Sequence, residues 1–250
     1  METRNIVLNS IQPKDMAALK PHLKLVELAS GDVLYEPDQK VDRVHFPNTA
    51  VLSVVMVMED GRTVETDTVG FESAVGLVAA LGSSVSINRI FTQIPGFTLA
   101  LSAHILRQQV DQSPPLRSLL LRHAQANLAQ AHQSVACNAL HGVEQRLCRW
   151  LLASNDRTAR DVVELTQQDL ATMVGVQRTT ITQTLRELTS AGLIQQGRGH
   201  IRILNRRGLE TRACECYMTL LGTLNRVIGP DATVESSAAA PRAVRAPETK

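Results

Sequence analysis

Two short amphipathic segments separated by a glycine, between residues 164 and 204, constrain the fold of this chain more than any other feature. Thr166 is placed to cap a first helix, with Asp169 three residues later near the positive end of the helix dipole. Gly175 has no Cβ, so the chain can turn tightly there. A second helix starts near Gln177 and buries three residues at helical spacing: Ile181, Leu185 and Leu188. The pattern predicts a helix-turn-helix.

The opposite face of this second helix is polar. It carries Arg178, Thr179, Thr182, Gln183 and Arg186, which a helix pair buried inside a core would not require. Such a face is typical of a helix that enters a groove of DNA.

A small hairpin is predicted directly after the second helix. Gly192 ends the helix, and apolar residues on both sides of a glycine-containing turn suggest two short strands up to Ile203. Near the tip, Arg198, His200 and Arg202 would contact phosphates and add affinity without reading bases. The hairpin is then a wing; the alternative is a solvated hairpin that binds nothing.

Composition fits a chain of one or two domains. With 250 residues and 44% hydrophobic content, the sequence has no apolar run long enough to cross a bilayer. The amino terminus lacks the basic start and apolar core of a secretory signal, so the cytoplasm is the expected location. Residues 1–113 carry nine Lys and Arg against thirteen Asp and Glu, whereas residues 142–212 carry eleven, all Arg, against seven. The basic part contains the predicted helix-turn-helix.

The first 113 residues predict a β-domain. Short apolar runs separated by turn signals continue from about residue 25 to residue 102. The clearest hairpin joins residues 51–58 to residues 63–69 across Asp60 and Gly61. The other runs suggest a small barrel or roll.

A long helix is predicted at residues 114–141, because apolar residues recur there at intervals of three or four. The stripe consists of Leu116, Leu120, Ala124, Leu128, Ala131 and Val135. It is narrow and rich in small residues, so we expect a two-helix seam between identical subunits. The alternative is a helix packed on its own β-domain.

A second domain is expected at residues 142–228. It would start with a helix from Val143 to Ala153 and a polar loop at residues 154–161, and it would end, after the wing, with one helix from Gly208 to Val227 packed on this domain. Residues 229–250 are rich in Ala, Pro, Ser and Arg, and they are expected to be a disordered tail.

An α+β chain with these parts in this order resembles the Crp/Fnr family of bacterial transcription regulators. The most specific match is LTQQDLATMVGVQRTTITQTLREL at residues 165–188. The resemblance implies an N-terminal β-roll of the cyclic-nucleotide-binding, jelly-roll type, a long dimerisation helix and a C-terminal winged helix-turn-helix. It also implies a homodimer that binds a two-fold symmetric promoter site, with RNA polymerase as a further partner.

The resemblance further implies roles for individual residues. Arg178 falls on the family's base-reading Arg and would fork onto guanine. Thr179 stands where the family usually has Glu, and Gln183 where it often has Arg or Ser, so contacts to a thymine methyl and to adenine predict an altered half-site. Besides the wing, phosphate contacts are expected from Thr166, Gln168, Thr180, Thr182 and Arg186.

The effector site departs from the family pattern. Cyclic-nucleotide binders of the family carry a Gly-Glu pair and, about ten residues later, Arg-Ser or Arg-Thr for the cyclic phosphate. Here the Gly-Glu pair is missing and Arg89 is out of register. Gly70, Glu72 and Arg89 are therefore candidates for a pocket that binds an unidentified effector, and cyclic AMP is not expected.

No metal or cofactor site is expected. Family members with an iron–sulfur cluster carry clustered cysteines near the amino terminus, and this chain has no cysteine before Cys137. Cys214 and Cys216 lie too close together in the sequence to form a four-ligand site alone, so a simple thiol pair is favoured.

The favoured interpretation is a sequence-specific, DNA-binding transcription regulator whose β-roll modulates the DNA-binding half. The alternative is a ligand-sensing or protein-interaction module whose winged helix binds another protein. An enzyme is not expected, because the sequence contains no nucleophile elbow, phosphate-binding glycine loop or paired metal-ligand His motif.

Overall fold

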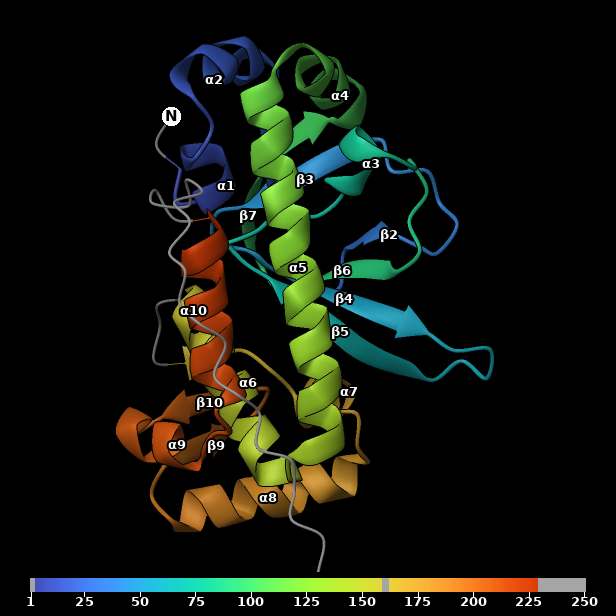
Figure 1. Ribbon diagram of the computed structural model, residues 1–250. Coiled ribbons are helices and arrows are strands. Elements are labelled where there is room, and N and C mark those ends of the chain that lie inside the picture. The colour runs from blue at the N-terminus through green and yellow to red at the C-terminus, as the bar shows by residue number, and fades with distance from the viewer. Residues whose placement is uncertain (1–2, 159–161, 229–250) are drawn as a thin grey trace, which may run out of the picture.

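The computed structural model describes residues 3–158 and 162–228, with side chains up to residue 222. A β-domain and a smaller helical domain lie at opposite ends of one long helix, α5 (Pro114–Leu140) (Figure 1). This arrangement confirms the predicted α+β fold. The tail expected at residues 229–250 lies outside the described residues.

Two antiparallel sheets enclose a single apolar core and form the predicted β-roll. In one sheet the strand order is β1 (Lys24–Leu28), β7 (Gly96–Ser102) and β3 (Arg43–Pro47). In the other it is β2 (Val33–Tyr35), β6 (Arg89–Ile94), β4 (Val51–Val57) and β5 (Thr63–Val69). The predicted hairpin is β4–β5, and Gly61 in its turn has φ +81°, a conformation that favours glycine. Phe46, Leu52 and Leu99 are buried between the sheets.

Several short helices cover the roll, and the sequence analysis did not predict them. They are α1 (Ile6–Asn9), α2 (Pro13–Leu19), a 3₁₀ turn (Lys20–His22), α3 (Val78–Leu81) and α4 (Ala103–Gln112). Asn5 caps α1 and also donates to the backbone carbonyls of Pro47 and Ser73, so the amino-terminal segment is fixed to the roll.

The apolar stripe of α5 divides between two environments, which corrects the predicted single seam. Leu116 and Leu120 are buried in the core of their own roll, whereas Leu128 is 57% and Val135 is 70% exposed. Ala124 and Ala131 are half-buried. The reason is geometric: a row of residues spaced by four drifts around a helix of 3.6 residues per turn.

The helix α6 (Val143–Thr158) is longer than predicted. Residues 154–158, expected as a polar loop, continue the helix. Two side chains of this last turn have buried or half-buried partners: Arg157 pairs with Glu72 of the roll, and Asp156 pairs with Arg206. Tertiary contacts therefore stabilise a polar segment that would otherwise favour a loop.

The helix-turn-helix and the wing form as predicted. The first helix is α7 (Gln167–Val174) and the second is α8 (Arg178–Ser190). The wing strands are β9 (Ile194–Gly197) and β10 (His200–Ile203), and a short strand β8 (Val162–Val163) that was not predicted adds to the free edge of β10. Val51 and Ile94 of the roll share a core with this domain.

The final segment forms two helices rather than the predicted single one. These are α9 (Arg206–Arg212), capped by Asn205, and α10 (Cys216–Ile228). The chain is extended at Ala213 (ψ 151°), where α9 ends, and Cys214 and Cys216 are buried. Moreover, α10 packs mainly along α5 and only slightly on the second domain (Figure 1). Among the described helices, none is long and apolar enough to span a membrane.

Candidate nucleic-acid interface and regulatory sites

The helix-turn-helix is held by local contacts that the sequence predicts. The Thr166 hydroxyl accepts a hydrogen bond from the backbone N–H of Asp169 at 3.2 Å. The Asp169 carboxylate accepts one from the backbone N–H of Thr166 at 2.7 Å, which completes a capping box. Gly175 has φ +69°, so the chain reverses there in the left-handed conformation. These contacts fix the angle at which α8 leaves α7.

The polar face of α8 points into solvent. Arg178, Thr179, Gln183 and Arg186 are exposed, and the amide of Gln183 donates to Glu187 at 3.1 Å. Two other threonines of α8, Thr180 and Thr182, have hydrogen-bond partners within the protein. The Thr182 hydroxyl donates to Gln167 of α7 at 2.7 Å, and the backbone carbonyl of the half-buried Thr180 accepts from Thr184.

A hollow of about 420 Å³ lies between the starts of α7 and α8 and the wing. Gln168, Arg178, Arg198 and His200 line it, so residues predicted from two separate motifs converge on one surface. Arg202 is exposed on β10 and does not line this hollow. We refer to the exposed residues Arg178, Thr179, Gln183, Arg186 and Arg198 as the recognition surface. Within the described residues, its three arginines form no ion pair.

The three residues proposed for an effector pocket do not converge. Glu72 forms an ion pair with Arg157 at 2.7 Å, with both side chains 11% exposed. The Gly70 N–H donates to Glu72 at 3.1 Å, and a Cβ on Gly70 would approach Arg157 to 2.8 Å. Arg89 instead faces Glu36 at 3.5 Å. Gly70 and Glu72 thus belong to a contact between the roll and α6.

Buried acids occupy the roll beside this contact. Glu65 accepts hydrogen bonds from Ser53 at 2.6 Å, from Gln93 at 3.0 Å and from Thr68. Burial raises the pKa of Glu65 to about 7.

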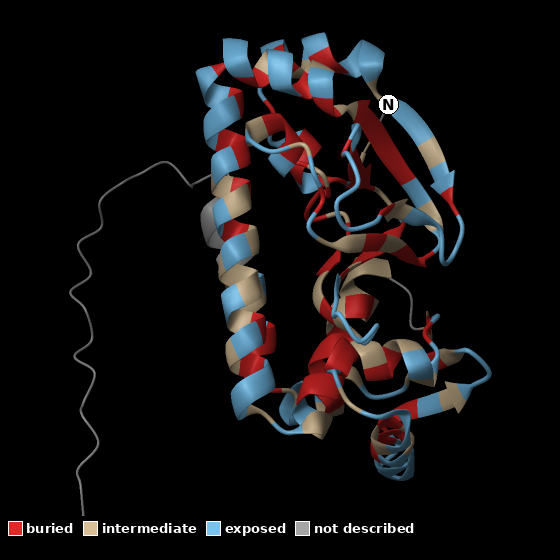
Figure 2. Cartoon of the chain, turned by 90° about the vertical axis from the view of Figure 1, so that its right-hand side faces the viewer, coloured by how far each residue is buried: buried red, intermediate tan, exposed pale blue. Residues whose placement is uncertain are grey.

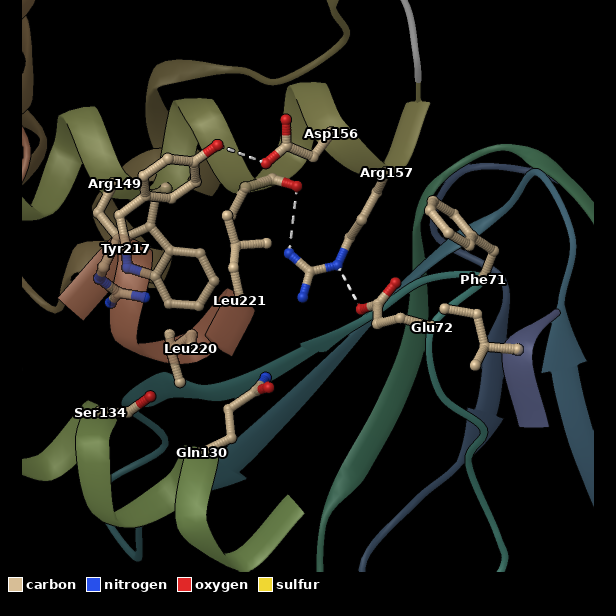
Figure 3. A pocket seen from close by; sticks show the side chains of 13 residues that line it. Phe71, Glu72, Gln130, Ser134, Arg149, Asp156, Arg157, Tyr217, Leu220 and Leu221 are labelled. Atoms are coloured by element: carbon tan, nitrogen blue, oxygen red, sulfur yellow. Dashed lines mark hydrogen bonds and ion pairs between the residues drawn. The ribbon is translucent and has the colours of Figure 1, made fainter. Parts of the chain in front are cut away.

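A pocket of about 270 Å³, which we term the junction pocket, lies between the roll, α5, α6 and α10 (Figure 3). Its lining includes Phe71, Gln130, Arg149, Trp150, Arg157 and Tyr217. The guanidinium of the buried Arg149 stacks over Trp150 at 4.4 Å. Within the described residues, its Nε and Nη2 atoms have no hydrogen-bond partner. The sequence analysis missed this pocket because its residues come from five segments that lie far apart in the sequence.

A second unpredicted site lies where α5 ends. The ligand atoms of Cys137, His141, Cys214 and Cys216 all lie within 4.8 Å of one another. A hydrogen bond from the Cys214 thiol lowers the pKa of Cys137. The sequence analysis considered Cys214 and Cys216 alone, because nothing in the spacing indicates that Cys137 lies beside them.

Known proteins show similarity to both halves of the chain. Residues 145–212 match the model of the Crp-like helix-turn-helix domain. Over 198 residues the chain is 22% identical to a CRP-like cAMP-activated global transcriptional regulator of Mycobacterium tuberculosis, covering 76% of this chain and 88% of that protein. Over 109 residues it is 29% identical to the transcriptional regulator SdrP of Thermus thermophilus, covering 41% of this chain. That match spans about half (54%) of the length of SdrP.

The fold is shared with solved structures. FixK2 from Bradyrhizobium japonicum superposes with a TM-score of 0.68 at 16% sequence identity, covering 77% of this chain and 98% of that chain. At this identity the likeness concerns the fold alone. It confirms the predicted arrangement of roll, long helix and helix-turn-helix domain.

Proposed function

The chain is a Crp/Fnr-type transcription regulator with a helix-turn-helix DNA-binding domain, and from this premise we propose that it binds a two-fold symmetric promoter site as a homodimer. The observation that carries the proposal is the recognition surface. Its arginines are exposed and without ion pairs in the described part of the chain, so their full charge is available to guanine and phosphate. Such a regulator would act in the cytoplasm, where promoter DNA and RNA polymerase lie.

Within the recognition surface, we assign base reading to Arg178, Thr179 and Gln183. We assign phosphate contacts to five residues that are exposed or half-buried: Gln168, Arg186, Arg198, His200 and Arg202. Thr166 and Thr182 already use their hydroxyls within the protein, so we expect them to position α7 and α8 rather than to bind phosphate.

The second half of the proposal, a homodimer, is supported by α5. Leu121, Leu128 and Val135 are 53%, 57% and 70% exposed and recur every seven residues. Half-buried Ala124 and Ala131 lie between them. A heptad of large apolar residues with small residues in between fits knobs-into-holes packing against a second copy of the same helix. Figure 2 shows α5 at one edge of the molecule, with exposed residues along its length.

The DNA-binding half is tested by Arg178→Ala in the full chain. Loss of a bidentate contact to guanine should weaken binding to the cognate upstream region about 10- to 100-fold, with the thermal unfolding curve unchanged. Arg117→Ala is the matched control. It removes the same charge from an exposed position in the first turn of α5, at the end of this helix that is remote from α8. Unchanged affinity of Arg178→Ala in a fluorescence-anisotropy titration would contradict the assignment.

The dimer is tested by Leu128→Glu, which places a charge in the middle of the exposed heptad row. Sedimentation equilibrium should then show a monomer where the parent chain is a dimer. Leu25→Glu is the control, since Leu25 is 61% exposed on β1 and lies far from the row. If both variants remain dimeric, the seam does not lie on this face of α5.

We further propose that an effector, if the protein requires one, enters the junction pocket rather than the interior of the roll. The stacked Arg149 and the apolar lining favour a ligand with an acidic group and an apolar body.

The need for an effector is tested by measuring how the ligand-free chain binds to its own upstream region across a salt series. Tight, specific binding would show that no effector is required, whereas weak, non-specific binding would support one. Binding that does not depend on salt would favour the alternative of a protein partner.

A further inference from the structure

Three cysteines and one histidine from two distant segments meet at the C-terminal end of α5. Cys137 lies in the last turn of α5 and His141 is the C-cap of this helix, while Cys214 lies between α9 and α10 and Cys216 is the first residue of α10. The Sγ atoms of Cys137 and Cys214 are 3.5 Å apart, and the Sγ of Cys216 is 3.5 Å from the Nδ1 of His141. The three cysteines are buried against each other.

These separations fit the ligand shell of one metal ion. In a tetrahedral zinc site, metal–sulfur bonds of about 2.3 Å and metal–nitrogen bonds of about 2.0–2.1 Å place the ligand atoms roughly 3.5–3.8 Å apart. All four ligand atoms here lie within 4.8 Å of one another, so a small adjustment of rotamers closes the shell. An iron–sulfur cluster would hold several iron and sulfide atoms between the same ligands and would need a wider separation.

The surroundings of the four residues also resemble a metal site. The Nε2 of His141 lies 3.2 Å from a carboxylate oxygen of Glu215, so the other nitrogen, Nδ1, is left facing the thiols. A carboxylate behind a ligating imidazole is the usual outer contact of a zinc site. The amide of Gln133 donates to the Sγ of Cys216 at 2.9 Å, and such a contact stabilises a thiolate.

We propose that Cys137, His141, Cys214 and Cys216 bind a single Zn²⁺ ion in a Cys₃His site. On binding, the three thiols release their protons to solvent and bond to the ion as thiolates. The ion joins the end of α5 to the segment that leads from α9 into α10. It therefore holds the DNA-binding domain at a fixed angle to the long helix. This role is independent of which DNA sequence the protein reads.

The metal content of the full chain tests the proposal. Protein purified with reductant and without chelator should contain about one zinc per chain, as measured by inductively coupled plasma mass spectrometry. Replacement of the metal by Co²⁺ should give thiolate charge-transfer absorption and the intense visible bands of a tetrahedral site. Cys214→Ser should lose both signals. Cys148→Ser is the matched control, because Cys148 is equally buried but outside the four-residue group.

A second variant avoids disturbing the buried thiols. Glu215 is 76% exposed, so Glu215→Gln should leave the fold intact while weakening zinc affinity about 10-fold in competition with a chelator. The proposal is overturned if the parent chain holds no zinc and Co²⁺ gives only octahedral bands. It is equally overturned if the chain contains iron and sulfide, or if a disulfide between Cys137 and Cys214 forms under the same reducing conditions.

Discussion

The recognition surface and the junction pocket use the same residue type, arginine, in opposite ways. Arg178 and Arg198 are exposed and form no ion pair within the described residues. Arg157 and Arg149 are nearly or fully buried, one paired with Glu72 and the other stacked on Trp150. Arg178 and Arg198 should therefore influence the affinity for DNA with little effect on stability. Arg157 and Arg149 should instead influence the stability of the fold and the arrangement of the domains.

The two regions are physically connected. Val51 and Ile94 of the roll pack in the same core as α6 and the helix-turn-helix, and Val64 of β5 approaches Gly175 in the turn between α7 and α8. A movement of the roll would therefore be transmitted to α8 through these packed side chains. The following substitutions test how far the two regions are separable.

The largest effect is expected from Arg157→Leu. This change leaves Glu72 buried without its partner, which costs on the order of 3–5 kcal/mol of unfolding free energy. Urea denaturation followed by circular dichroism measures the loss. Arg186→Leu on the recognition surface is the control and should change stability by less than about 0.5 kcal/mol. Equal losses in both variants would remove the distinction between the regions.

A smaller effect that depends on pH is expected from Glu65→Gln. Burial raises the pKa of Glu65 to about 7, so folding favours its neutral form. The stabilisation is complete below the unfolded pKa near 4.5 and is lost as pH rises through 7. The variant should therefore gain stability relative to the parent between pH 5 and pH 8, by roughly 3 kcal/mol at most. Urea denaturation of both chains at pH 5 and at pH 8 measures this difference in unfolding free energy. If the difference is the same at both pH values, Glu65 does not titrate in this range.

The smallest effect is expected from Arg198→Ala in the wing. Loss of one phosphate contact should weaken binding to cognate and unrelated DNA alike and reduce the slope of log affinity against log salt by about 1. Anisotropy titrations at several salt concentrations measure both quantities. A loss confined to the cognate site would mean that the wing reads bases, and the recognition surface would then extend beyond α8.

Local sequence was sufficient for the helix-turn-helix. Thr166, Asp169 and Gly175 act through contacts within three or four residues, so their spacing alone predicts where α7 begins and ends. The hairpin of β4 and β5 and the helix α5 were predictable for the same reason. The orientation of α5 was not, since an apolar row cannot show which part of it faces the roll and which part faces solvent.

The sites between segments depended on tertiary structure. Arg149 and Phe71 reach one pocket from different elements, and Cys137 meets Cys214 across 77 residues of sequence. The last turn of α6 is polar and was predicted as a loop. It is a helix, and the ion pair between Arg157 and Glu72 stabilises it there.

The sequence by itself therefore determined the type of regulator, the helix-turn-helix with its hairpin, the β4–β5 hairpin and the long helix α5, because caps, turns and periodicity act over a few residues. Only the tertiary structure decided where the junction pocket and the cluster of Cys137, His141, Cys214 and Cys216 lie. Both are formed by side chains whose neighbours are fixed only when distant segments pack together.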